Sequence, residues 1–199
     1  MKIIKVTNIE KFATKILPKQ PQKNRIIVES ILKDVKKNGD VAIRKYEKKF
    51  SRANITTLRV SKAEIKNAYS KVSKIELDSL RLAKKRLEKT ESAIKSLLKN
   101  KTINQDGIKI SKKFIPIQSV GCYIPGGLAK YPSSVIMSVV PATVAGVKRI
   151  VVVSPPNTDG KIDPLTIVAA NLCGANEIYK TGGVQSIAAL SYGTKSILK

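Results

Sequence analysis

The sequence predicts an α/β fold in which a mainly helical first part precedes a domain of alternating strands and helices. Residues 119–199 repeat the order strand, turn, helix three times, which is the pattern of a parallel sheet with helices on its faces. The charge divides at the same place, because 31 of the 38 Lys and Arg residues and 11 of the 14 Asp and Glu residues precede residue 119. We therefore expect a helical part over 1–118 and a second domain over 119–199, with the boundary near Gln118.

Helix signals dominate the start of the chain. Apolar residues at helical spacing predict a helix from Pro21 to Asn38, with Gly39 just beyond its end. Asp40 is expected to cap the next helix. Capping boxes at Ser61 to Glu64 and at Ser73 to Glu76 predict two further helix starts, and the second helix is expected to be long.

Two extended segments are also expected in the first part. The run T-T-L-R-V at Thr56 to Val60 is strand-like. The turn N-Q-D-G at Asn104 to Gly107 follows the long helix, and an extended segment should lead from it into the second domain.

The second domain has clear sequence signals for where its helices begin and end. Asp163 and Pro164 fit the N-cap and first position of one helix, and Gly174 lies beyond its end. The expected elements are strand Val120 to Ile124 with helix Pro132 to Ala145, strand Arg149 to Ser154 with helix Pro164 to Leu172, and strand Glu177 to Thr181 with helix Val184 to Tyr192. Ligands of such sheets bind outside the carboxyl ends of the strands, so these ends should form one rim.

The first strand runs into the glycine turn Pro125-Gly126-Gly127. Glycines let the backbone approach a ligand, and the following helix N-terminus favours an anion, so the turn is compatible with anion or dinucleotide binding. The spacing is not G-x-G-x-x-G, however, so this turn taken alone favours a purely structural role for the glycines.

The net charge of +24 raises the possibility of nucleic acid or an anionic membrane as partner. The lysines are spread over several amphipathic helices without interleaved aromatic residues, which favours solvated helix faces over a specific nucleic-acid site. Cys122 and Cys173 are 51 positions apart and the chain has no histidine, so neither a zinc finger nor a disulfide framework is indicated. No signal peptide or membrane span is expected, and we expect a cytoplasmic protein.

Several motifs, taken in order, are similar to those of the histidinol dehydrogenase family. They are V-G-C-Y-I-P-G-G at Val120 to Gly127, Y-P-S-S-V-I-M at Tyr131 to Met137, P-A-T-V-A-G-V at Pro141 to Val147, S-P-P at Ser154 to Pro156 and T-G-G-V-Q-S-I-A-A-L-S-Y-G-T at Thr181 to Thr194. A weaker likeness, K-N-G-D-V-A-I-R-K-Y, covers Lys37 to Tyr46. The chain resembles the amino-terminal half of such an enzyme.

The resemblance implies a Rossmann-like NAD-binding domain that is incomplete at its carboxyl end. It assigns Tyr123 and Gln185 as cofactor-binding residues, because the family's G-x-Y-x-P-G-G and G-G-x-Q motifs contact NAD. Family members oxidise L-histidinol through an aldehyde to L-histidine, and they are homodimers that use zinc.

The zinc ligands and the acid/base residues of the family follow the position of Thr194, so the resemblance implies no catalytic residue and no metal ligand in this chain. We therefore expect no turnover by the chain alone, and an exposed sheet edge after the last strand. The alternative is a non-catalytic basic helical module that binds nucleic acid or a protein partner.

Overall fold

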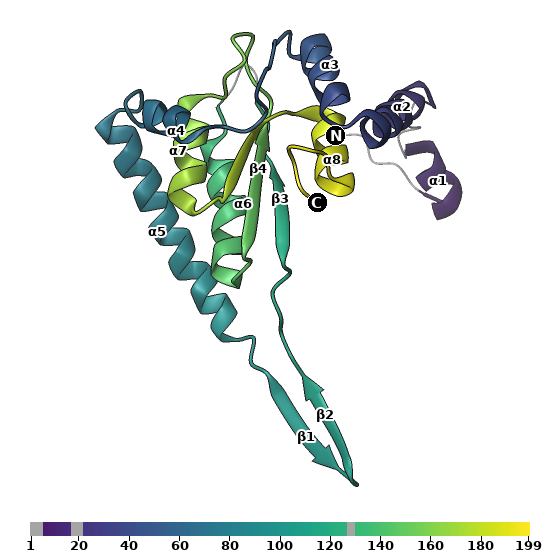
Figure 1. The fold of residues 1–199 in the computed structure, drawn as a ribbon. Coiled ribbons are helices and arrows are strands. Elements are labelled where there is room, and N and C mark those ends of the chain that lie inside the picture. The colour runs from purple at the N-terminus through teal and green to yellow at the C-terminus, as the bar shows by residue number, and fades with distance from the viewer. Residues whose placement is uncertain (1–5, 17–21, 127–129) are drawn as a thin grey trace.

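The computed structural model describes residues 6–16, 22–126 and 130–199 and shows the predicted mixture of helices and parallel strands (Figure 1). The elements are α1 Ile9–Ile16, α2 Gln22–Asn38, α3 Asp40–Phe50, α4 Lys62–Tyr69, α5 Lys74–Ser96, β1 Lys101–Gln105, β2 Ile108–Lys112, β3 Ser119–Tyr123, α6 Pro132–Ala145, β4 Arg149–Ser154, α7 Pro164–Cys173, β5 Glu177–Lys180 and α8 Gly183–Tyr192. Within the described ranges, no helix has the length and apolar character needed to cross a membrane.

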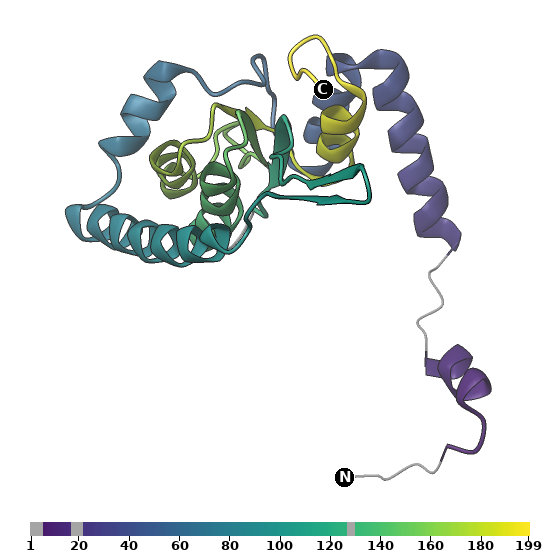
Figure 2. The same cartoon turned by 90° about the horizontal axis from the view of Figure 1, so that it is seen from below.

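Strands β3, β4 and β5 form one parallel sheet in that order, as the alternating pattern predicted. Successive residues of a strand point to opposite faces, so Val152 of β4 belongs to one hydrophobic cluster and Val153 to the other. Helices α6 and α7 pack on the face of Val152, with α4 and α5 outside them, whereas α2, α3 and α8 cover the face of Val153 (Figures 1 and 2). The continuous apolar run of β4 is thus buried on both sides.

Both clusters contain residues from either side of the boundary predicted near Gln118. Leu80 of α5 packs with Val139 of α6 on one face, and Ile43 of α3 packs with Ala189 of α8 on the other. The first part therefore supplies an outer layer to each face of the sheet. The division at residue 118 stays a prediction.

The strand predicted at Thr56 to Val60 is reduced to a single antiparallel bridge between Arg59 and Tyr179. The amide of Val60 donates to the carbonyl of Ile178 at 2.8 Å, and the amide of Lys180 donates to the carbonyl of Leu58 at 2.8 Å. The predicted open edge after the last strand is therefore wrong, because this segment borders β5. The edge without a partner strand in the described chain is that of β3.

The segment after α5 forms an antiparallel hairpin, β1 with β2, that projects away from the sheet (Figure 1). Its turn residues Asp106 and Gly107 have φ angles of 50° and 80°, as a two-residue type I′ turn requires. The prediction placed an extended segment only after this turn. It missed β1, whose polar sequence K-T-I-N-Q carries little strand signal.

The predicted helix ends mostly agree with the structure. Both capping boxes are formed, and Asp163 accepts a hydrogen bond from the amide of Leu165. Asp40 is an exception, because it is the first residue of α3 and its carboxylate accepts from the amide and hydroxyl of Ser196 instead of capping the helix. Pro21 and Gly127 lie outside the described residues.

Candidate cofactor-binding site

The carboxyl ends of the three parallel strands lie at the upper end of the sheet in Figure 1, where the family motifs end. Tyr123 is paired in register with Val153, and Ser154 is paired with Lys180. The amide of Ile124 continues the ladder by donating to the carbonyl of Val153 at 2.9 Å. The turns after β3, β4 and β5 therefore begin at the same level and form the predicted rim.

Pro155, in the turn after β4, separates the turns that follow β3 and β5. A Cβ added to Gly126 would lie 2.7 Å from Cγ of Pro155, and one added to Gly182 would lie 2.5 Å from Cβ of Pro155. Both distances are shorter than real Cβ contacts, so these glycines are required by the proline ring. Gly126, Pro155 and Gly182, one from each of the three turns, thus pack together.

Tyr123 ends β3 with 40% of its surface exposed, although its strand neighbours Cys122 and Ile124 are buried. Helix α8 returns over the opposite face from α6 and α7, and it crosses β3 so closely that a Cβ on Gly121 would be 2.6 Å from Cδ1 of Leu190. In doubly wound sheets the ligand crevice lies at the carboxyl ends where helices change face. Tyr123 therefore lies at this crevice, and its exposed ring offers a surface on which a flat ligand can stack.

Gln185 has a different environment, because its side chain is only 2% exposed. Its amide nitrogen Nε2 donates to Oε1 of Glu47 at 2.8 Å, and its own oxygen Oε1 is buried without a hydrogen-bond partner. The sequence predicted Gln185 at the start of the last helix, and the structure has it in the first turn of α8. Its cofactor contact stays a prediction, and any such contact has to reach a buried side chain.

Glu47 of α3 is the site residue that sequence reasoning missed. It lies in the run K-Y-E-K-K, which is typical of a solvated helix face, yet it is fully buried. The contacts that bury it come from residues more than 130 positions later in the chain. No local signal could have found it.

The described residues at the rim include no cluster of metal-ligating side chains. No group of three or more His, Cys, Asp or Glu side chains positioned to hold an ion occurs in the part of the chain that the structure describes. Cys122 and Cys173 are both buried and free. Burial raises the pKa of both thiols, that of Cys173 to about 11, so neither is an ionised ligand near neutral pH.

A separate cavity of about 410 Å³ lies between α4 and the segment before α7. Its lining is of mixed charge, with Lys71 and Lys161 opposed by Glu64 and Asp159. Neither Tyr123 nor Gln185 lines it, and the family motifs of the three turns do not converge there. The candidate site is therefore the rim at the carboxyl ends of the strands and not this cavity.

The doubly wound arrangement and the rim at its carboxyl ends define an α/β protein of the Rossmann-like class. Within that class, residues 17–199 match the family model described as histidinol dehydrogenase, and the chain belongs to this family.

Relatives named histidinol dehydrogenase include one from Gloeobacter violaceus, 43% identical over 195 residues, with 96% of this chain and 43% of the relative covered. Another, from Methanococcus maripaludis, is 45% identical over 173 residues, with 86% and 40% covered. The crystal structure of histidinol dehydrogenase from Elizabethkingia anophelis matches with a TM-score of 0.85 and 33% identity, covering 96% of this chain and 45% of that one. The chain thus spans less than half the length of the relatives it matches.

Proposed function

We propose that this chain is the amino-terminal portion of an NAD-dependent, zinc-requiring histidinol dehydrogenase that oxidises L-histidinol through the aldehyde to L-histidine. In this proposal the chain provides one wall of the NAD site and none of the zinc or acid/base groups. The observation that carries it is the packing of the three turns around Pro155, which brings the family motifs to one rim beside the exposed Tyr123.

The residues at the rim suit a dinucleotide. The ring of Tyr123 offers a flat apolar surface with a hydroxyl at its edge, and Gly126 leaves the backbone of its turn uncovered on the exposed side. Gln185 supplies a polar group below the turn after β5. NAD, when bound, accepts the hydride in this chemistry, and the role of these side chains is to bind and orient it.

The zinc ion of the proposed enzyme does not fit residues of this chain. Zinc in catalytic sites is held by histidine, cysteinate or carboxylate ligands, and this chain has no histidine and two buried thiols of raised pKa. We therefore assign the zinc ligands to the remainder of the complete enzyme, and no catalytic step to a metal held here.

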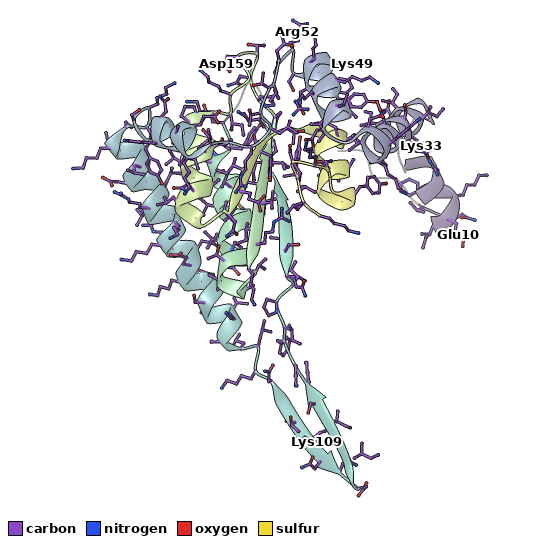
Figure 3. All side chains as sticks on the ribbon, viewed as in Figure 1. Glu10, Lys33, Lys49, Arg52, Lys109 and Asp159 are labelled. Carbon is purple, nitrogen blue, oxygen red and sulfur yellow. The ribbon has the colours of Figure 1, made fainter. Side chains whose placement is uncertain are left out.

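The alternative, a basic module for nucleic acid or a protein partner, draws support from the net charge of +24. The basic side chains belong to several separate elements, however, among them α2, α3, α5 and the hairpin. Lys33 of α2 and Lys49 of α3 lie on neighbouring helices, whereas Lys109 lies far from both on the hairpin (Figure 3). Charge distributed over several elements is more typical of solvated helix faces than of a specific binding site for nucleic acid or a protein partner.

We further propose that the complete enzyme is a cytoplasmic homodimer. Two free, buried cysteines suit a reducing compartment. The hairpin exposes Ile103, Ile108 and Ile110, and the pairing of Ile103 with Ile110 puts these side chains on one face. A two-stranded hairpin is marginal alone, so another surface should cover it. Ile110→Lys should then weaken the dimer in analytical ultracentrifugation, and a monomeric wild-type enzyme would contradict the proposal.

The direct test is a chimaera in which this chain replaces the matching segment of the Gloeobacter violaceus relative. Histidinol-dependent formation of NADH, followed by absorbance, is expected from the chimaera and not from residues 1–199 alone, because hydride transfer needs the cofactor, the alcohol and the base together. An inactive but folded chimaera would contradict the proposed function. Zinc-dependent turnover by residues 1–199 alone would show that the active site has been misplaced.

A further inference from the structure

Glu47 is a buried carboxylate that joins helix α3 to the turn after β5. Its atom Oε1 accepts three hydrogen bonds, from the hydroxyl of Thr181 at 2.8 Å, the amide of Gly182 at 2.9 Å and Nε2 of Gln185 at 2.8 Å. Its atom Oε2 accepts from the hydroxyl of Ser51 at 2.7 Å. A buried charge is tolerated only with such partners, so the carboxylate and the T-G-G-x-Q turn determine each other's positions.

This arrangement fixes the orientation of the Gln185 amide. A carboxylate only accepts hydrogen bonds, so the end of Gln185 that meets Glu47 is the nitrogen. The oxygen is therefore directed away from Glu47. Among the buried side-chain polar atoms that the structure describes, it is the one without a hydrogen-bond partner.

The unpartnered oxygen lies directly below an exposed glycine. A Cβ added to Gly183 would be 2.9 Å from Oε1 of Gln185, and the φ angle of Gly183 is +56°. Any other residue would therefore cover the oxygen and strain the backbone. Buried acceptors without partners are rare and usually mark a site where a ligand or water completes the hydrogen bond.

We propose that Glu47 is a positioning residue of the cofactor wall: it holds Gln185 so that the amide oxygen Oε1, and not the nitrogen, is offered to a hydrogen-bond donor of NAD. The inference rests on the proposed function, since it takes NAD as the ligand. Donors of this kind on NAD are its ribose hydroxyls, the carboxamide nitrogen and the amino group of adenine. The cofactor reaches Oε1 at Gly183, where the turn carries no side chain.

The experiment uses isotope-labelled chain 1–199 and NAD as the probe, observed by NMR. In the wild type, the Gln185 side-chain amide and the Gly182 amide should be protected from hydrogen exchange before NAD is added. NAD should move the Gln185 carbonyl carbon Cδ downfield, because Oε1 gains a donor, and should leave the protection of Nε2 intact. Release of Nε2 from Glu47 on binding, with Cδ unchanged, would overturn the assignment of Oε1.

Substitutions distinguish a role of Glu47 in positioning Gln185 from a contribution to the stability of the fold alone. Glu47→Ala should abolish both protections and weaken NAD binding at least tenfold, and Glu47→Gln, which keeps one acceptor oxygen, should weaken it less. The matched control is Glu64→Ala, which removes a carboxylate bonded to Lys180 at 2.9 Å near the end of β5 but not to the turn. It should lower stability without changing the protection of Gly182 or the affinity for NAD.

The outcomes distinguish this inference from the proposed function. Unchanged NAD affinity in folded Glu47→Ala would overturn the inference alone. If Glu47→Ala does not fold, Glu47→Gln is the deciding variant. The inference would be overturned if Glu47→Gln kept both the NAD affinity of the wild type and its protection of the Gln185 amide. If the wild-type chain alone binds no NAD, the same variants are compared in the chimaera, which supplies the rest of the NAD site. Unchanged NAD affinity of Glu47→Ala in the chimaera would overturn the inference, whereas the activity of the unsubstituted chimaera tests the proposed function.

Discussion

Gly182 lies against the ring of Pro155 so closely that a Cβ on the glycine would be 2.5 Å from Cβ of the proline. The φ angle of Gly182 is −131°, which any residue adopts, so the glycine is required by packing and not by backbone conformation. Pro155 also meets Gly126 from the turn after β3. Contacts at one proline therefore set the spacing of all three turns at the rim.

Gly182→Ala should destabilise the chain by about 1–3 kcal/mol, the usual cost of adding a methyl group to a packed site. Urea unfolding monitored by circular dichroism measures this cost. The matched test is Pro155→Gly in the same background, because it removes Cβ, Cγ and Cδ of the proline, which all lie within 2.9 Å of the added methyl group. The two substitutions should be strongly non-additive, and simple additivity would contradict the contact.

Tyr179 makes the stability depend on pH in alkaline solution. Burial, together with its hydrogen bond to Glu177, raises the pKa of Tyr179 to about 12, above the ordinary value near 10. Because the folded state favours the neutral phenol, this contribution is complete below pH 10 and is lost as the pH rises toward 12. Two pKa units correspond to about 3 kcal/mol.

Tyr179→Phe removes this titration and serves as the reference, because lysine titration affects both proteins alike. Urea unfolding at several pH values should show the wild type losing more stability than the variant between pH 10 and 12. Parallel curves would contradict the raised pKa.

Binding of the chain to duplex DNA should be weak, independent of sequence and abolished by moderate salt. The basic side chains are spread over separate elements, so they attract phosphates only through the general field of the protein. Fluorescence anisotropy over a salt series measures this. A tight, sequence-selective complex near physiological salt would favour the basic binding module over the enzyme.

The elements that the sequence predicted well carry local signals. Helix α6 has the predicted bounds Pro132–Ala145, because a proline starts it and Gly146, with φ of 94°, ends it. The capping boxes at Ser61 and Ser73 likewise depend on side chains three residues apart. Such signals are readable without knowing the tertiary structure.

The features that the sequence could not predict depend on distant partners. Asp40 has the residue type of a cap, yet Ser196 competes for its carboxylate. The segment around Arg59 has strand character, but only one bridge to Tyr179 forms. The buried position of Gln185 follows from Glu47, which no pattern near either residue reveals. The candidate site was therefore located by motif, whereas its hydrogen bonding required the structure.

The central claim is that Tyr123 and Gln185 belong to the NAD wall, and steady-state kinetics of a complete enzyme carrying this segment tests it most directly. Tyr123→Ala and Gln185→Ala should each raise the KM for NAD about tenfold, the loss of one stacking or hydrogen-bond contact worth roughly 1–2 kcal/mol. The KM for histidinol should change less. Tyr192→Ala, which removes another exposed tyrosine at the far end of α8, is the control and should leave both constants unchanged. Unchanged NAD dependence in both site variants would contradict the claim.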